Sequence, residues 1–273
     1  LKTKLPLPEE TWKGCWELHM NSKILQIVKE GRRLEGELII DSHCHVGHAM
    51  PTITHGDSIH AIEGTLDRIG IDTACICTRG AGVVGDPFEA NNITASYVKS
   101  NPQLFRGYVT IAANYGNYVE EIKRGEAMGL DLGIKMHVYR QKHDLNEPRF
   151  AEMLEYLDSR GRILLHHYFG PPARLEPLLK KYRNIKFLEG HCIFEYAELA
   201  RKYENMYINT CAEIGFDNIR RIVEAAGAEK IIYGSDMSAL DVTFSLGAVA
   251  YAKIPDDDKR KILGLNMKNI MES

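Results

Sequence analysis

The stretch Leu38-Ile39-Ile40-Asp41-Ser42-His43-Cys44-His45 begins the part of the chain that decides the fold. Its apolar start predicts a buried β-strand over Leu38–Cys44. The strand runs into histidines, whereas the first strand of a nucleotide-binding open sheet is followed by a glycine-rich turn. Side chains alternate along a strand, so His43 and His45 project to the same side and can bind one ion together.

Seven more short apolar or β-branched runs follow, separated by polar stretches that in several places have helical periodicity. The predicted strands are Thr73–Cys77, Gly107–Ile111, Leu132–Met136, Arg162–His166, Ile185–Leu188, Met206–Asn209 and Lys230–Tyr233, and the helical patterns include Phe150–Arg160, Arg174–Tyr182, Tyr196–Tyr203 and Ile219–Ala226. Eight strands that alternate with helices are typical of a closed (β/α)₈ barrel, the TIM barrel. A doubly wound open sheet is the competing architecture.

The segment before the first strand has a different pattern. From Glu9 to about Lys29 apolar residues recur at helical spacing, which predicts one amphipathic helix. We therefore expect residues 1–36 to form an N-terminal helical extension. Residues 37–273 are then expected to form one α/β domain, a single (β/α)₈ TIM barrel.

Composition narrows the class of partner. Thirty-four Lys and Arg residues against 37 Asp and Glu residues give a formal net charge of −3, which does not favour nucleic acid. No run of eighteen apolar residues occurs, so we expect no membrane span. The six cysteines are scattered through a long chain, which favours reduced thiols and a cytoplasmic protein. The expected partner is a small-molecule substrate, and a homo-oligomer is left open.

Polar residues that can do chemistry gather at the predicted strand ends. Lys135 and His137 end the fourth strand, His191 the sixth and Asp236 the eighth. In a barrel these carboxyl ends converge on one mouth. Imidazole nitrogens and a carboxylate are suitable ligands for zinc, manganese or iron, so the strand ends predict a metal site.

The fifth strand ends in two histidines, of which strand alternation allows only one to point inward. We predict His166, because Ile163, Leu164 and Leu165 lead directly into it, with His167 as the alternative. The candidate ligand set is then His43, His45, His166 and Asp236. Asp41 is a candidate to hold the ring of His43 from behind, or else a buried partner for a lysine.

Five motifs in this order carry a family resemblance. The motifs are Asp41-Ser42-His43-Cys44-His45, Gly133-Ile134-Lys135-Met136-His137, Leu165-His166, Glu189-Gly190-His191 and Tyr233-Gly234-Ser235-Asp236. Together they resemble the amidohydrolase superfamily over residues 37–273. More narrowly, they resemble the amidohydrolase-related branch that includes aminocarboxymuconate semialdehyde decarboxylase and many metal-dependent TIM-barrel hydrolases.

The resemblance implies roles for these residues. His43, His45, His166 and Asp236 are expected to hold one divalent metal ion, with zinc favoured and manganese or iron as alternatives, and His191 to act as the acid/base beside it. In two-metal relatives a lysine on the fourth strand is carboxylated, which would make Lys135 a bridging ligand. We expect one ion instead.

In the one-metal interpretation three further residues are candidates for contacts with the substrate. Lys135 and His137 then face the substrate from the fourth strand, and Arg79, after the second strand, is a candidate to bind a carboxylate.

The main functional expectation is a metal-dependent hydrolase, in which a metal-activated water attacks a small ester, lactone or amide carbonyl. His191 and Asp236 would move the protons. The alternative, which the named relative implies, is a metal-dependent non-oxidative decarboxylase, a lyase, that acts on a small unsaturated or aromatic carboxylic acid. A second alternative is a non-catalytic metal-binding protein.

Overall fold

A computed structural model describes residues 21–47, 58–78, 86–137, 142–213 and 217–273. All strand pairs in it are parallel. One sheet contains β1 (Ile40–Val46), β2 (Thr73–Thr78) and β3 (Phe105–Gly107) in this order. The other contains, in sequence order, β4 (Val109–Thr110), β5 (Gly133–Met136), β6 (Ile163–His166), β7 (Lys186–Glu189), β8 (Met206–Asn209) and β9 (Ile231–Ile232).

Backbone hydrogen bonds join the two sheets at both seams. β3 and β4 are one strand position interrupted at Tyr108, whose amide still donates to Ile76 O of β2 at 2.9 Å. At the other seam Ser42 N donates to Tyr233 O at 3.0 Å, and Cys44 forms an isolated parallel bridge with Met237. The eight strand positions therefore form a (β/α)₈ TIM barrel, which confirms the predicted fold.

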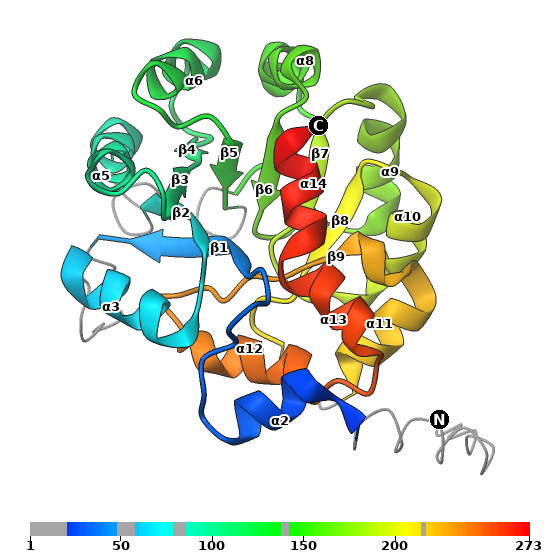
Figure 1. Cartoon of the computed structure of the whole chain (residues 1–273). Coiled ribbons are helices and arrows are strands. Elements are labelled where there is room, and N and C mark those ends of the chain that lie inside the picture. Colours follow the sequence, from blue (N-terminus) through cyan, green and yellow to red (C-terminus); the bar gives the residue numbers. More distant parts are fainter. Residues whose placement is uncertain (1–20, 48–57, 79–85, 138–141, 214–216) are drawn as a thin grey trace.

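Helices surround the strands (Figure 1). Local sequence sets their ends: Ser58 Oγ accepts the Ala61 amide at the start of α3, and Gly70, at a φ of 94°, ends it. The main helices are α3 (Ile59–Ile69), α5 (Pro87–Ser100), α6 (Tyr118–Ala127), α8 (Ala151–Arg160), α9 (Pro172–Lys181), α10 (Ala197–Lys202), α11 (Asn218–Ala226) and α12 (Val242–Tyr251), followed by α13 (Asp256–Arg260) and α14 (Asn266–Glu272). No helix among the described residues is long and apolar enough to cross a membrane.

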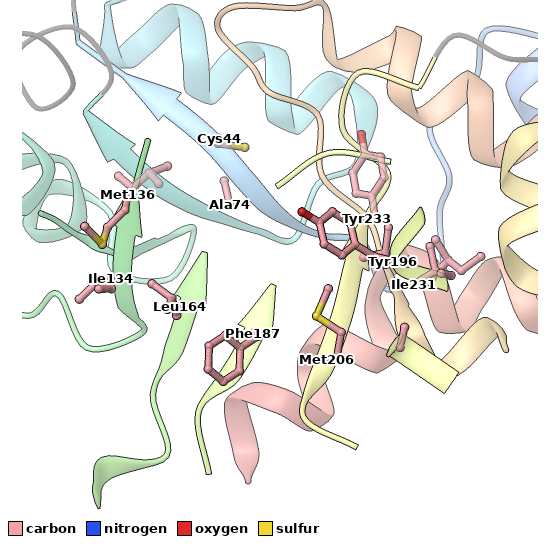
Figure 2. Close-up of a cluster of buried hydrophobic side chains, with 14 of the residues drawn as sticks. Cys44, Ala74, Ile134, Met136, Leu164, Phe187, Tyr196, Met206, Ile231 and Tyr233 are labelled. Atoms are coloured by element: carbon pink, nitrogen blue, oxygen red, sulfur yellow. The ribbon is translucent and has the colours of Figure 1, made fainter. Parts of the chain in front are cut away.

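Buried apolar residues form two clusters, and residues of one strand alternate between them. The cluster between strands and helices includes Ile134, Leu164 and Phe187 (Figure 2). The second cluster consists of the alternate residues of the strands together with two side chains of α14. Its members include Cys75, Cys77, Leu165, Leu188, Ile232, Met267 and Ile270. We assign this second cluster to the barrel interior, because only there do alternate residues of all these strands meet.

α14 covers the amino-terminal end of the barrel. Asn266 Nδ2 donates to the carbonyl oxygens of Ala228 and Ile231, both at 2.8 Å, at the start of β9. The carboxyl ends of the strands, where the histidines lie, are at the opposite end of the barrel.

The predicted strands agree with the observed ones to within two residues, apart from the break at Tyr108. The single helix expected from Glu9 to Lys29 is wrong at Ser22, which has an extended backbone and caps α2 (Lys23–Lys29) by accepting the Leu25 amide. Residues 1–20 lie outside the described residues, so the rest of the helical extension stays a prediction.

Candidate active site

His43 and His45 of β1 meet Asp236, which follows β9, at the carboxyl end of the barrel. Each offers one ligand atom, and these atoms lie within 4.8 Å of one another. His45 Nε2 is 2.9 Å and His43 Nε2 3.8 Å from Asp236 Oδ1. Two imidazoles and a carboxylate that converge in this way are a donor set that fits a divalent cation such as zinc or manganese.

The backbone around Asp236 is shaped for this meeting. Asp236 has a left-handed φ of 59°, a conformation that costs a non-glycine residue free energy and concentrates at functional sites. Its amide donates to His43 O at 2.9 Å, which ties the carboxylate to the histidine strand. A Cβ at Gly234 would displace the side-chain amide of Asn209, which donates to Ser42 Oγ and accepts from Cys211 N.

The ring of His43 is held by a carbonyl oxygen. Its Nδ1 lies 3.0 Å from Gly190 O and donates to it, which places the lone pair on Nε2. Lys135 Nζ contacts this nitrogen at 2.7 Å, so an ion bound there takes the place of that contact. Gly190 approaches β6 so closely that a Cβ would lie 2.7 Å from His166 O. Asp41 does not bind the ring: its Oδ1 accepts the amides of His43, at 3.2 Å, and Ser235, at 3.0 Å, so it fixes the backbone at the seam.

Lys135 lies against the ring of His43, within the group of candidate ligands. Its Nζ is 2.7 Å from His43 Nε2, and its side chain is buried. Burial lowers the pKa of Lys135, although Cys77 and Asp236 oppose the shift. Burial and the Lys135 charge together lower the pKa of His43 well below its ordinary value, so this imidazole is neutral and can act as a ligand.

His45 has a different environment. Its Nδ1 lies 3.3 Å from Cys77 Sγ, and its Nε2 faces Asp236. Burial lowers its pKa, but the Cys77 thiol and Asp236 outweigh burial and raise the pKa to about 9. A metal ion at this site must therefore displace a proton from His45.

The expectation that His166 points inward is wrong. Leu165 belongs to the interior cluster, so its neighbour His166 projects to the opposite side. There His166 Nε2 lies 2.9 Å from His143 Nε2, and its ring stacks on Phe169, which in turn packs against Phe187 of the outer cluster. The structure thus brings His43, His45 and Asp236 together without His166.

His167 lies with the other histidines of the mouth. Its ring stacks on that of His137 at 3.8 Å between centroids, and its Nδ1 is 2.8 Å from His191 Nε2. Asp236 is among the charges that act on it, although burial and His137 dominate and lower its pKa. From the sequence, His166 was preferred as the inward histidine and His167 was the alternative. Because Leu165 lies in the barrel interior, His167 is the one that points inward.

His191 connects this group to the metal-ligand candidates. Its ring centroid is 5.9 Å from that of His43, and its Nδ1 lies 3.4 Å from Cys211 Sγ. Burial, and then the Lys135 charge, lower the pKa of His191 to about 4. At neutral pH His191 is therefore an uncharged imidazole, held between His167 and Cys211.

A cavity of about 600 Å³ opens beside these histidines. Its lining combines imidazole, phenol and apolar groups, a composition suited to a small organic ligand. The lining residues include His167, Tyr168, Pro171, His191, Glu195 and Tyr196.

Two further expected contacts have different outcomes. His137 is half-buried and lies in the histidine stack at the mouth. Arg79 lies outside the described residues, so its substrate contact stays a prediction. Cys77 and Cys211 were not singled out in the sequence, although Cys77 could have been found there, because it pairs with His45 once the first two strands are aligned.

A TIM barrel with a histidine and carboxylate cluster at the carboxyl ends of its strands defines the metal-dependent barrel enzymes as a class. The family model described as Amidohydrolase matches residues 78–267. The chain belongs to this family, which confirms the resemblance; β1 and its two histidines precede the matched stretch. No curated protein matches the sequence.

Solved structures share the fold at low identity. 2,6-Dihydroxybenzoate decarboxylase from Rhizobium is 14% identical, with a TM-score of 0.70 over 88% of this chain and 99% of that chain. Dihydroxybenzoic acid decarboxylase from Polaromonas sp. JS666 is 15% identical, with a TM-score of 0.69 over 86% and 97%. 5-Carboxyvanillate decarboxylase from Novosphingobium aromaticivorans is 16% identical, with a TM-score of 0.65 over 89% and 98%. At these identities the likeness shows the fold.

Proposed function

We propose that this protein is a metal-dependent non-oxidative decarboxylase of small aromatic carboxylic acids. The observation that carries the proposal is the convergence of His43, His45 and Asp236 at the barrel mouth. The ring centroid of His43 lies 5.9 Å from that of His191, which lines the cavity. The decarboxylases named above support this choice over hydrolysis, which was the first expectation from the sequence.

The cofactor is proposed to be one divalent ion held by His43, His45 and Asp236. We assign His167 as the fourth ligand in place of His166, because it is the histidine of its strand that lies at the mouth. Two of the similar decarboxylases contain manganese, so manganese is a candidate beside zinc. Such an ion would bind anionic oxygens of the substrate and polarise the ring.

The remaining steps belong to the chain's own residues. The bond between the ring carbon and the carboxylate breaks, CO₂ leaves, and the electron pair stays on the ring carbon, which must take one proton. His191 is placed to deliver this proton. Its low pKa rises when an anionic substrate enters beside it, because a nearby negative charge favours the imidazolium form. Solvent then restores the proton.

The substrate is proposed to bind in the cavity between His167, His191 and Tyr168. An aromatic ring fits a volume of about 600 Å³ and can stack on the imidazole and phenol rings of the lining. Lys135, whose buried Nζ lies 2.7 Å from His43 Nε2, would contribute positive charge beside Asp236 and the substrate.

Hydrolysis of a small ester, lactone or amide is the second candidate, and the description of the family as amidohydrolases favours it. His191, uncharged at neutral pH, would then act as a base toward water. A non-catalytic metal-binding role is less favoured, because His191, whose ring lies 5.9 Å from that of His43, lines a cavity that fits a small ligand.

The test compares the products of the two reactions. Manganese- and zinc-loaded protein is incubated with a panel of hydroxybenzoic acids and with matched methyl esters and lactones. Decarboxylation predicts CO₂ release and an arene with one more ring hydrogen, which carries deuterium when the solvent is D₂O. Ester or lactone cleavage without CO₂ release would favour the hydrolase, and loss of both activities after chelation is the control for metal dependence.

A further inference from the structure

Two ring nitrogens face away from the proposed ion and need partners. His43 Nδ1 donates to a carbonyl oxygen, Gly190 O. Metal-bound histidines usually have such a partner, either a carboxylate, a carbonyl or water, which fixes the tautomer and the ring orientation. His45 has a thiol in this place, because its Nδ1 lies 3.3 Å from Cys77 Sγ.

The strand pairing places this thiol. His45 of β1 and Cys77 of β2 are register partners in a parallel pair, so the two residues lie side by side. Both side chains are buried, at 4% and 1% exposure, which leaves little room for water to replace the thiol. The contact therefore follows from the sheet rather than from a mobile loop.

The contacts of Cys77 Sγ determine where the thiol proton and the Nδ1 proton of His45 lie. Cys77 Sγ also lies 3.7 Å from Cys44 O, an atom that can only accept, so the thiol donates its proton there. The sulfur then accepts from His45 Nδ1–H. With Nδ1–H held by the sulfur, Nε2 is the nitrogen that gives up its proton to the proposed ion, and it lies 2.9 Å from Asp236 Oδ1.

We infer that Cys77 is a positioning residue of the metal site, which holds the ring of His45 in the tautomer and orientation that bind the ion. The inference rests on the proposed function, since it assumes that His45 Nε2 is a ligand. Cys77 is not itself a ligand of this ion, because its sulfur lies on the Nδ1 side of the ring, away from Nε2.

Two other cysteines supply matched controls. Cys75 lies two residues earlier in β2 and is equally buried in the barrel interior. Cys75→Val makes the same substitution as Cys77→Val on the same strand, but at a position that does not contact His45. Cys211 contacts Nδ1 of His191, which is not a proposed ligand, so Cys211→Val removes a thiol–imidazole contact and leaves the ligand set intact.

The experiment measures metal affinity, not turnover. Each protein is stripped with a chelator and titrated with Mn²⁺, and the free ion is followed by its electron paramagnetic resonance signal. Cys77→Val is expected to weaken binding by about 10–100-fold, the usual cost of losing such a partner. Cys77→Ser keeps a hydroxyl that can accept from Nδ1–H and donate to Cys44 O, so it should remain within about threefold of the wild type on the same grounds. Cys75→Val and Cys211→Val should bind as the wild type does.

Equal affinity in Cys77→Val and Cys75→Val would overturn the inference, as would a serine variant no better than the valine variant. Circular dichroism and the melting temperature of the stripped proteins show whether each variant folds; if Cys77→Val does not fold, Cys77→Ala carries the same comparison. A wild-type protein that takes up no manganese or zinc would overturn the proposed metal site as well, so the two failures are distinct.

Discussion

The backbone amide of Asp236 donates a hydrogen bond to the carbonyl oxygen of His43 over 2.9 Å. The same contact is part of the seam at which the last strand position meets the first. Three of the candidate ligands, His43, His45 and Asp236, thus lie on the two strand positions that close the barrel. Because the seam fixes their relative position before any ion binds, the site is preorganised, and disturbing the seam should disturb metal binding.

Replacing His43 and His45 together by alanine should abolish metal retention, because two ligands on one strand cannot be supplied from elsewhere. Metal content is measured by elemental analysis of protein purified without chelator. His60→Ala is the control, since this side chain is 93% exposed on α3. A double variant that keeps one equivalent of metal would refute the site.

The two histidines at the end of β6 should behave differently. His167→Ala is expected to lower metal occupancy, whereas His166→Ala should retain the metal and instead lower the free energy of unfolding. The latter loss is about 1–3 kcal/mol, because His143 Nε2 is left without its partner in a buried place. Both predictions are checked by measuring the metal content and the urea unfolding curve of each variant. Metal loss in His166→Ala alone would restore the original sequence-based assignment.

His191→Asn should keep the metal and lower kcat by about 10²–10⁴-fold, the usual contribution of a general acid or base. The reason is that His191 reaches the cavity and contacts His167 without joining the donor cluster of His43, His45 and Asp236. Metal content and turnover are measured on one preparation. Loss of the ion together with activity would make His191 a ligand.

Asp256→Asn should lower the free energy of unfolding by about 1–2 kcal/mol at pH 7, because a neutral amide replaces a charged acceptor that also faces Lys259. The Asp256 carboxylate accepts from Ser22 Oγ, at 2.5 Å, and from the amides of Lys23 and Ile24 at the start of α2. Burial alone would raise the pKa of Asp256, but these hydrogen bonds outweigh it and lower the pKa.

Because this pKa is lower in the folded state, the stabilisation is present above the unfolded pKa of Asp256 and is lost as the pH falls through its folded pKa. The difference between wild type and Asp256→Asn should therefore shrink in acid, as urea titrations at several pH values would show. Asp257→Asn is the control, because that side chain is 87% exposed. A difference that stays constant down to low pH would argue against the carboxylate as the cause.

Much of the fold could be predicted from the sequence because strands and helices alternate regularly. The directions in which His166 and His167 point could not be predicted from it. Strands of a parallel sheet are apolar on both faces, so Ile163, Leu164 and Leu165 show no alternation that tells inside from outside. The packing of Leu165 into the barrel interior determines which histidine points inward, and that packing depends on the neighbouring strands.

Site residues that lie on one strand could be predicted from the sequence. Contacts between residues of two different strands were harder to predict, because they depend on how the strands are aligned. His43 and His45 share a face by local geometry alone. The contact of Cys77 with His45 and that of Gly190 with His43 depend on strand register and on the packing of glycine against β6. The break at Tyr108 likewise follows from pairing on both sides of one strand, since its amide bonds to β2 while Ile111 bonds to Lys135 of β5.

The most direct test of the metal site is anomalous X-ray scattering at the manganese edge from crystals of the manganese-loaded protein. We predict a single ion at the carboxyl end of the barrel, bonded to Nε2 of His43, Nε2 of His45 and the carboxylate of Asp236. A peak at any other place, or a second ion bridged by a carboxylated Lys135, would contradict the one-ion site.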